Sequence, residues 1–598
     1  MPISGRNPAR TIRFGVFELD TQARELWKRG SKLRLKDQAY QTLMVLLEHP
    51  GQVVAREQFK EKIWVEGTFV DFEGAINKTI SQLRAALGDD PQNPRFIETL
   101  SKRGYRFIAP VERDHPTAAR QNASRSIIVL PFENLTGAPE QRFVADGIVE
   151  ALIGRLGTVS GLRVISRTSA MAYAIGSKSL FAIGQELGVD AAVEGSVMRS
   201  GNTVRVTARL VEILHEGLIW QGKYDRGIEN LLELYDDLAE MITNAITGPS
   251  AHGNLSRSKT PGNIAPEAHI AYLKGRYLWN RRNEKDLYSS IEEFQRALTV
   301  SPNFAMAESG MADAYVLVGV WGLQPSHTAF RMARRSAERA LELDDALAEA
   351  HTCFAEVLKD YDWDWSASER EFKRAIALNP NYSTAHQRYA QLLLVLGRYG
   401  EAIAEMEMAR KTDPLSPAIN SYLPYVYLAA RDYGRAQEEG RRAVDLEPHS
   451  ALAHWQLGRA CLFSGTTKEG LSELESAAKL GGSLSIWRAE LCFARGRVGD
   501  RQGAEVILNE LLDRAHSTYV SPFDIALCFA GLEENNAALN YLEQAYQERV
   551  MRVIAIGDPE LDDLRSEPRF ASLVHQLRIP TLQFRADQIR NFRSNVYD

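Results

Sequence analysis

Two consecutive stretches, INKTISQLRAALGDD at residues 76–90 and RFIETLSKRGYRFIAP at residues 95–110, decide how the amino-terminal part of this chain folds. In the first stretch apolar residues recur at spacings of four, three and four, at Ile76, Ile80, Leu83 and Leu87. This spacing places them on one side of an amphipathic helix that we expect over residues 72–87. The second stretch predicts two short strands around Lys102-Arg103-Gly104-Tyr105.

The residues before this helix complete a small α+β domain. Apolar and polar residues alternate over residues 12–35, which predicts a small antiparallel sheet with a hairpin turn at Gly30-Ser31. Helical periodicity follows over residues 37–49 and 55–65, with one apolar face in each. Residues 10–111 hold 17 Lys and Arg against 13 Asp and Glu, whereas the whole chain has a net charge of −6. A basic segment on an acidic chain fits a contact with nucleic acid.

Segment 10–111 resembles the winged-helix effector domain of OmpR-type response regulators and of CadC-like one-component regulators, and the two quoted stretches carry the resemblance. It implies that the helix enters the major groove of duplex DNA and that the hairpin, the wing, lies on the adjacent minor groove. The DNA-binding residues that it implies are Lys78, Thr79, Ser81, Gln82 and Arg84 on the helix, and Lys102, Arg103 and Tyr105 on the wing. Base-edge and nearby backbone contacts then fall to Lys78, Ser81 and Gln82, and a phosphate contact falls to Arg84.

The sequence leaves alternatives open for these residues. Lys78 and Gln82 each fit a solvated helix face, and Arg84 fits an ion pair with an acidic neighbour. The helix also carries few basic residues, which predicts modest affinity of a single copy and a need for dimers or tandem sites.

The chain departs from the usual pattern of both groups of regulators. The winged helix begins near residue 10, which leaves no room before it for a phosphoacceptor receiver domain. A polar linker at residues 112–124 stands where CadC-like proteins often have a membrane helix. No run of 18 apolar residues occurs, and the first residues lack the apolar core of a signal peptide. We therefore expect a cytoplasmic protein without a membrane partner.

A second domain, of the α/β class, is predicted over residues 125–247. Its elements are a strand at 126–132, a helix over 140–157, a strand at 162–166, a helix over 178–188, three alternating strands and a helix over 229–246. The order βαβαβββα favours a mixed sheet with helices packed on it. The stretches SIIVLPFENLTG (126–137) and FVADGIVEALIGRLG (143–157) resemble the TolB amino-terminal-type domain. The resemblance implies a non-catalytic module for interaction or ligand sensing.

A linker rich in Gly, Ser and Pro at residues 248–265 precedes a repetitive segment, residues 266–580. Turn residues recur 34 positions apart, at Pro380, Pro414, Pro448 and Gly482. This interval is the period of the tetratricopeptide repeat, which the segment resembles. We expect about eight helix pairs that begin near residues 271, 314, 349, 383, 417, 451, 485 and 519.

Two irregularities and a terminal cap are expected in this array. The second pair carries an insertion around residues 320–327, and the third has an extra residue near DYDWDWS (360–366). The last helix is expected near residues 567–577. Such pairs stack into a superhelix whose concave face binds a protein or peptide partner. Most aromatic residues, including Tyr425 and Trp455, are expected to pack between helices.

The sequence carries no motif for catalysis, a metal or a cofactor, so we expect none of the three. Four cysteines, at Cys353, Cys461, Cys492 and Cys528, lack paired spacing and are predicted to be buried apolar residues. Asp146 is explained by a helix turn. A phosphate could lie at the helix start Ser166-Arg167-Thr168-Ser169, but no glycine-rich loop supports it.

The sequence thus predicts a multidomain transcription regulator of the bacterial one-component type. An α+β winged helix binds double-stranded DNA, and an α/β middle domain and an all-α tetratricopeptide superhelix receive a signal or a protein partner, with a homodimer as one means of coupling. The alternative is a scaffold or adaptor protein in which the winged helix serves only for docking. A role beside nucleotide cyclase chemistry rests only on where domains like the middle one occur.

Overall fold

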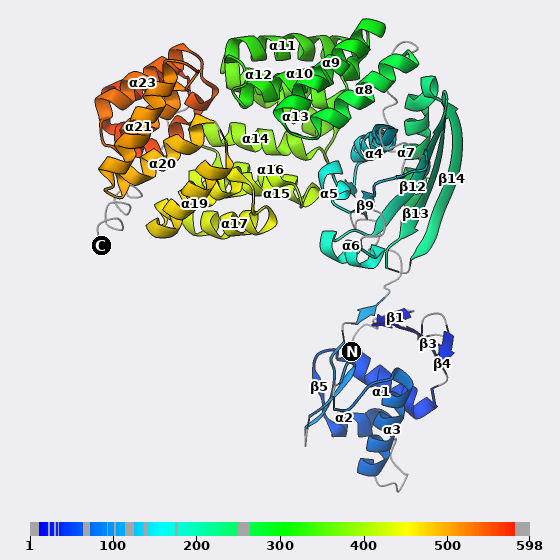
Figure 1. Ribbon diagram of the computed structural model, residues 1–598. Coiled ribbons are helices and arrows are strands. Elements are labelled where there is room, and N and C mark those ends of the chain that lie inside the picture. Colours follow the sequence, from blue (N-terminus) through cyan, green and yellow to red (C-terminus); the bar gives the residue numbers. More distant parts are fainter. Residues whose placement is uncertain are drawn as a thin grey trace, which may run out of the picture. The chain divides into compact units, whose positions relative to one another are not determined.

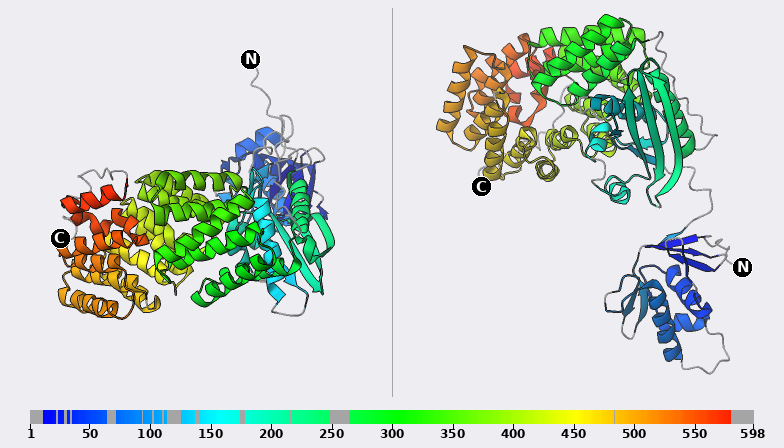
Figure 2. Two further views of the ribbon diagram at one scale, coloured as in Figure 1. Left: turned by 90° about the horizontal axis from the view of Figure 1, so that it is seen from above. Right: turned by 45° about the vertical axis from the view of Figure 1, so that its right-hand side comes forward.

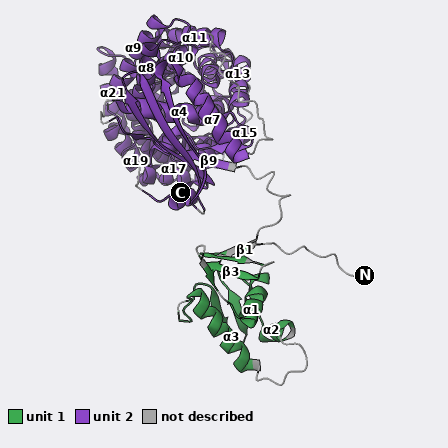
Figure 3. Cartoon of the chain, turned by 90° about the vertical axis from the view of Figure 1, so that its right-hand side faces the viewer, with its two compact units in different colours: residues 1–123 green, residues 124–598 purple. Residues whose placement is uncertain are grey.

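The computed structural model describes residues 11–21, 24–28, 31–33, 35–63, 72–92, 94–100, 103–109, 111–113, 125–136, 141–173, 178–214, 216–247, 264–482 and 484–579. The chain divides into two compact units, Met1–Ala123 and Ser124–Asp598 (Figure 3). They are called the N-terminal unit and the C-terminal unit below.

The N-terminal unit combines two small sheets with three helices (Figure 1). One sheet has the strand order β4-β3-β2-β1-β8, formed by β1 (Thr11–Phe14), β2 (Phe17–Asp20), β3 (Glu25–Lys28), β4 (Ser31–Leu33) and β8 (Glu112–Arg113). The other has the order β5-β7-β6, formed by β5 (Val53–Val54), β6 (Ile97–Leu100) and β7 (Gly104–Phe107). The helices are α1 (Asp37–Glu48), α2 (Arg56–Ile63) and α3 (Phe72–Leu87). The predicted α+β fold with a closing hairpin is confirmed.

Two details of this unit differ from the prediction. Ser31 pairs with Lys28 and belongs to β4 rather than to the turn, while residues 29 and 30 lie outside the described residues. Strand β8 pairs with β1, so residues 112 and 113, which we expected in a linker, extend the first sheet.

The apolar side of α3 lies at the centre of the core of this unit. Ile76, Ile80, Leu83 and Leu87 are all buried, as their spacing predicted, in one cluster with residues of α1 and α2. Phe14 of the first sheet meets Phe107 of the second edge to face, with ring centroids 5.2 Å apart. Because burial of each such side chain stabilises the fold by about 2 kcal/mol, this packing fixes which side of α3 faces solvent.

The first part of the C-terminal unit is a mixed sheet with the strand order β11-β9-β12-β13-β14, and β10 pairs with β12. Strands β11, β9 and β12 run parallel, whereas β12, β13 and β14 run antiparallel. Their bounds are β9 Arg125–Val129, β10 Glu133–Asn134, β11 Leu162–Val164, β12 Ala191–Ser200, β13 Thr203–Glu212 and β14 Gly217–Gly227. The predicted mixed sheet is confirmed.

Helices cover one face of this sheet (Figure 2) and only part of the other. One face packs against α4 (Arg142–Gly157) and α7 (Leu231–Thr247), which follows the short 3-10 helix η2 (Ile228–Asn230). The other face packs against α5 (Arg167–Met171) and α6 (Leu180–Leu187) near the start of β12. Helix α5 begins at the helix start that the sequence indicated at residues 166–169. We did not predict β10, because two residues are too few to show a periodic pattern.

Eight helix pairs follow, as the 34-residue period predicted. The first helices of the pairs, called A helices, are α8 (Pro266–Trp279), α10 (Ala305–Val320), α12 (Ala348–Val357), α14 (Ser383–Val395), α16 (Pro417–Ala429), α18 (Ala451–Phe463), α20 (Ser485–Arg497) and α22 (Pro522–Gly531). The second helices, called B helices, are α9 (Glu284–Val300), α11 (Ser326–Leu343), α13 (Trp365–Leu378), α15 (Tyr399–Thr412), α17 (Tyr433–Leu446), α19 (Thr467–Leu480), α21 (Arg501–Ala515) and α23 (Asn535–Gln547). Helices α14, α16, α18 and α20 begin at the predicted residues, whereas α8 and α10 begin several residues earlier than predicted.

Both predicted irregularities have a structural counterpart. Residues 321–325 form the turn between α10 and α11, within the predicted insertion. The DYDWDWS stretch overlaps a π-helical turn, η3 (Leu358–Asp362), which accommodates an extra residue in a helix. Asp364 then begins α13, because its carboxylate accepts the backbone N–H of Ala367 at 3.0 Å.

After α23 the chain leaves the repeat pattern. Two 3-10 helices, η4 (Met551–Gly557) and η5 (Pro559–Ser566), precede α24 (Pro568–Gln576), which lies where the last helix was predicted. Consecutive A helices contact one another and form the inner layer of the array, and η4 contacts α14 while η5 contacts α22 in that layer. The segment expected to cap the end of the array therefore lies along its inner face.

Polar contacts join the mixed sheet to the turns between repeats. Asn381, in the turn before α14, donates to the backbone carbonyls of Gly157 and Leu162 at 2.9 and 2.8 Å. In the turn after α15, the carboxylate of Asp413 accepts the backbone N–H and the hydroxyl of Ser169 at 3.0 and 2.6 Å. The start of α5, where the sequence left room for a phosphate, thus holds a carboxylate of the repeat array. The middle domain and the repeats form one compact unit.

Replacing Asp413 by Ala is expected to weaken this junction. The substitution leaves two buried donors of Ser169 without an acceptor, which costs about 2 kcal/mol and lowers the urea midpoint of the full chain. The matched control is Glu447→Ala, at the same helix-end position one repeat later. Equal midpoints for the two variants would contradict this account of the junction.

Candidate nucleic-acid interface

Helix α3 presents a stripe of solvent-exposed residues on the side away from the core. The stripe consists of Glu73, Gly74, Asn77, Lys78, Ser81 and Ala85. Spacings of three and four place them in line along the helix. Three of the six residues, Gly74, Ser81 and Ala85, are small, so another molecule can approach the helix backbone closely. Two residues that the resemblance assigned to DNA, Lys78 and Ser81, lie in this stripe.

The other helix residues assigned to DNA lie off the stripe. Gln82 is half-buried at its edge. Thr79 is only 3% exposed, and its hydroxyl donates to the backbone carbonyl of Ala75 at 2.9 Å. Since Thr79 belongs to the packed side of the helix, its polar atom serves the fold.

The side chain of Arg84 lies against the wing and does not project from α3 into solvent. Its guanidinium donates to the carbonyl of Ile97 at 2.6 Å and to the hydroxyl of Thr99 at 2.9 Å, both on β6. It also lies 3.9 Å from the carboxylate of Asp89. The acidic partner that the sequence left open as an alternative is therefore present, and Arg84 ties the end of α3 to the wing.

Asp89, just after α3, also holds the first strand of the wing in place. Its buried carboxylate accepts the backbone N–H groups of Arg95, Phe96 and Ile97 at 2.6, 3.1 and 2.9 Å. Three hydrogen bonds to one carboxylate fix where β6 begins relative to α3. Sequence reasoning missed this role, although an acidic residue just after a helix and before a strand was its visible signal.

The wing turns tightly because of one glycine. Gly104 has φ +134°, and a side chain there would place its Cβ 2.0 Å from the carbonyl oxygen of Val54. This close approach pairs β7 with β5 and leaves Arg103, the preceding residue, exposed at the turn. Lys102, the other basic residue assigned to the wing, lies outside the described residues.

Tyr105 points inward from the wing. It is 3% exposed and packs edge to face on Phe59, with centroids 6.0 Å apart. Burial raises the pKa of its hydroxyl, opposed by the nearby Arg56 and Arg84 guanidiniums, so the hydroxyl stays protonated. It donates to the side-chain oxygen of Asn77 at 2.6 Å. Tyr105 thus orients an exposed amide on the α3 stripe, and Asn77 joins the candidate contact residues that the sequence did not single out.

Metal-ligating side chains do not cluster within the described residues. These residues contain no group of three or more His, Cys, Asp or Glu side chains placed to hold a metal ion. The four cysteines are buried and unpaired, as predicted, and burial raises the pKa of the Cys353 and Cys528 thiols. No helix within the described ranges is both long and apolar enough to cross a bilayer.

Two family models match parts of the chain. Residues 30–107 match the family described as "Transcriptional regulatory protein, C terminal", and residues 364–421 match "Tetratricopeptide repeat". The N-terminal unit therefore contains a DNA-binding winged helix of the OmpR type, and the C-terminal unit contains tetratricopeptide repeats.

Curated relatives cover different shares of the chain. "Transcriptional regulator HilA" of Salmonella typhimurium is 22% identical over 443 residues, 72% of this chain and 76% of the relative. "Putative adenylate cyclase 3" of Rhizobium meliloti is 31% identical over 236 residues, 39% of this chain and 40% of the relative. This chain thus spans less than half of the cyclase's length. Among solved structures, the DNA-binding domain of Klebsiella pneumoniae RstA in complex with its RstA box is 28% identical over 17% of this chain and 97% of that chain, with a TM-score of 0.15.

Exchanging Lys78 and Arg103 for Ala is expected to weaken binding to duplex DNA while leaving stability unchanged. Each substitution removes one exposed cation, which costs about 1 kcal/mol of affinity and lowers the slope of log affinity against log salt by about 1. Fluorescence anisotropy with labelled duplex at several salt concentrations measures both effects. An unchanged salt slope for the double variant would remove these residues from the interface.

Arg84→Ala is expected to act on stability first. The loss of two hydrogen bonds and of the guanidinium near buried Asp89 costs about 2 kcal/mol, which lowers the melting temperature of residues 1–123 by about 10 °C. Arg95→Ala, at an exposed arginine of the same unit, is the matched control. A normal melting temperature with lost DNA binding would instead make Arg84 a direct contact.

Proposed function

We propose that this protein is a one-component transcription regulator in which residues 10–111 bind double-stranded DNA and the C-terminal unit receives an input. One observation carries the proposal: a winged helix with a solvent-exposed polar stripe on α3 and an exposed arginine at the turn of its wing. A helix fits the major groove, where polar side chains meet base edges, and cationic side chains add phosphate contacts. The relative named as a transcriptional regulator supports the proposal at the level of the whole chain.

The proposed contacts divide by position. Asn77, Lys78, Ser81 and Gln82 face base edges and the adjacent backbone, and Arg103 with Lys102 contacts phosphates from the wing. Arg84, Thr79 and Tyr105 act indirectly, because their polar atoms hold the helix, the wing and Asn77 in place.

A single copy of such an interface binds weakly. Lys78 is the one cation on the described α3 stripe, and phosphate neutralisation supplies most of the affinity of DNA-binding proteins. We infer that two copies act together, either as a homodimer or on tandem sites. We also propose that the working protein is cytoplasmic, because its proposed target is chromosomal DNA.

The low charge of the stripe also motivates a second candidate function. In a scaffold or adaptor protein, the repeats would do the main work and the winged helix would bind another protein. The two functions differ in one respect that is easily measured, since only the regulator needs Lys78 and Arg103 to occupy DNA.

Chromatin mapping in the host of this gene tests the proposal. We expect the full chain to occupy discrete promoters, the Lys78→Ala/Arg103→Ala variant to lose them, and residues 1–123 alone to bind without the normal change in output. Transcript levels of the bound genes provide the second readout. Occupancy that survives the double substitution favours the scaffold, and normal regulation by residues 1–123 alone would remove the input role of the C-terminal unit.

A further inference from the structure

The inner face of the repeat array is occupied by the chain itself. Residues 551–566, which comprise η4 and η5 and are called the return segment, contact side chains from α16, α18, α20 and α22. These are A helices, which form the inner layer of the array. The concave surface on which we expected a partner is therefore covered over this half of the array.

A buried arginine of the array binds two carboxylates of the return segment. Arg459 of α18 is fully buried, and its Nε and Nη2 donate to Glu560 at 2.6 and 2.9 Å. Its Nη2 also donates to Asp558 at 2.7 Å. The rings of Trp455 and Tyr425 lie 5.0 and 5.2 Å from the guanidinium carbon. These two aromatic residues, expected only to pack between helices, form the sides of a cation site.

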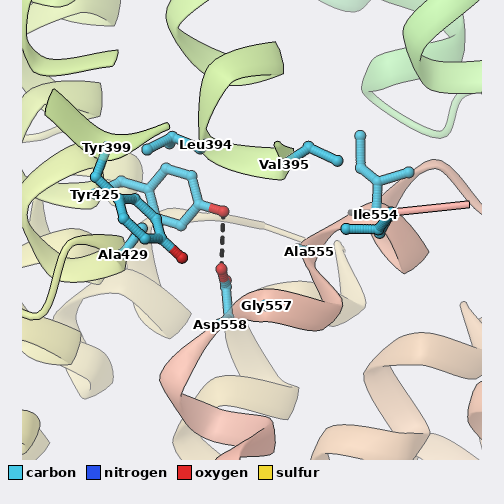
Figure 4. Close-up of a pocket in the computed structure, with 10 residues that line it drawn as sticks. Leu394, Val395, Tyr399, Tyr425, Ala429, Ile554, Ala555, Gly557 and Asp558 are labelled. Atoms are coloured by element: carbon cyan, nitrogen blue, oxygen red, sulfur yellow. Dashed lines mark hydrogen bonds between the residues drawn. The ribbon is translucent and has the colours of Figure 1, made fainter. Parts of the chain in front are cut away.

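The close-up of this region shows how the return segment reaches the array. The hydroxyl of Tyr425 donates to the second oxygen of Asp558 at 2.9 Å, which is the dashed line in Figure 4. A small cavity of about 20 Å³ remains between Tyr425, Leu394 and Ile554. The indole N–H of Trp455 is buried without a hydrogen-bond partner. The return segment therefore pairs with the Arg459 guanidinium of the groove, but it leaves the small cavity unfilled and the indole N–H of Trp455 without an acceptor.

A second ion-pair site has the roles exchanged, with the arginine on the return segment and the two carboxylates on the array. Arg552 donates to Asp524 of α22 at 2.7 Å and to Glu490 of α20 at 2.6 Å. At these two sites the array contributes Arg459, Glu490 and Asp524, and the return segment contributes Arg552, Asp558 and Glu560. Two further pairs lie near the end of η5, Arg431 with Asp562 at 2.8 Å and Arg497 with Asp563 at 2.7 Å.

Such an arrangement selects a particular segment more than it adds stability. Buried ion pairs stabilise a fold no better than well-packed apolar residues, but a segment that lacks one partner leaves a buried charge unpaired and is strongly disfavoured. The return segment also consists of 3-10 helix, whose hydrogen bonds are poorer than those of an α-helix. Its position depends on recognition by the groove rather than on structure of its own.

We propose that the return segment is an intramolecular ligand of the repeat array, and that the same groove accepts a partner protein segment of matching chemistry in its place. The matching segment carries an arginine followed six and eight residues later by carboxylates, as Arg552 is followed by Asp558 and Glu560. Binding of the partner then requires release of residues 551–566, so the groove is open only to a segment that outcompetes them.

A competition experiment with the full chain tests this exchange. The probe is a labelled peptide of residues 549–566, and the control peptide carries Asn and Gln at the positions of Asp558 and Glu560. The chain variant Asp558→Asn/Glu560→Gln leaves Arg459 without its carboxylates and is expected to bind the probe about tenfold more tightly than the unmodified chain, because more of its grooves are open. Adding Arg459→Met to that variant should abolish the gain. Equal affinity of the probe for all three chains overturns the proposal.

Hydrogen exchange on the unmodified chain provides a test that does not depend on the folding of variants. An exchangeable ligand opens locally, so amides of residues 551–566 should exchange well before those of α18 and α20. Excess probe peptide should speed their exchange further, and the control peptide should not. Exchange of the return segment only together with α18 and α20 would make it a fixed part of the array and overturn the proposal.

Discussion

The hydrogen bonds from Arg84 to the backbone of Ile97 and the hydroxyl of Thr99 are the interaction on which the proposed function depends. They join the end of α3 to the first strand of the wing, so that the two surfaces proposed to contact DNA keep one relative position. Asp89 secures the same strand through three backbone donors, and Tyr105 holds Asn77 from the other strand. A DNA reader of this kind needs a rigid support, because base-edge hydrogen bonds tolerate little displacement.

The C-terminal unit uses polar contacts for a different purpose. Its repeats are held together by apolar packing of neighbouring helices, which no single pair could achieve alone. Buried carboxylates and guanidiniums bind the segments that lie against the array. Asp413 accepts hydrogen bonds from α5 of the middle domain, and Arg459 donates hydrogen bonds to the return segment.

The sequence predicted the elements better than it predicted the site. The apolar spacing of α3 and the 34-residue period fixed helices and repeats, because both patterns come from surfaces that must be buried. Polar partners leave no such pattern. Whether Arg84 faces DNA or Thr99, and whether Tyr105 faces DNA or Asn77, depends on residues 15 and 28 positions away in the chain. The return segment could be predicted as a terminal element, but not its position along the inner face.

The most direct test of the central claim measures binding of purified residues 1–123 to duplex fragments of the host genome across salt concentrations. The account predicts retardation of a subset of fragments at about 50 mM salt, with affinity that falls steeply as salt rises, since phosphate contacts release counterions. An absence of binding to every fragment in dilute buffer would contradict it, and the repeat array would remain as the working part of the molecule.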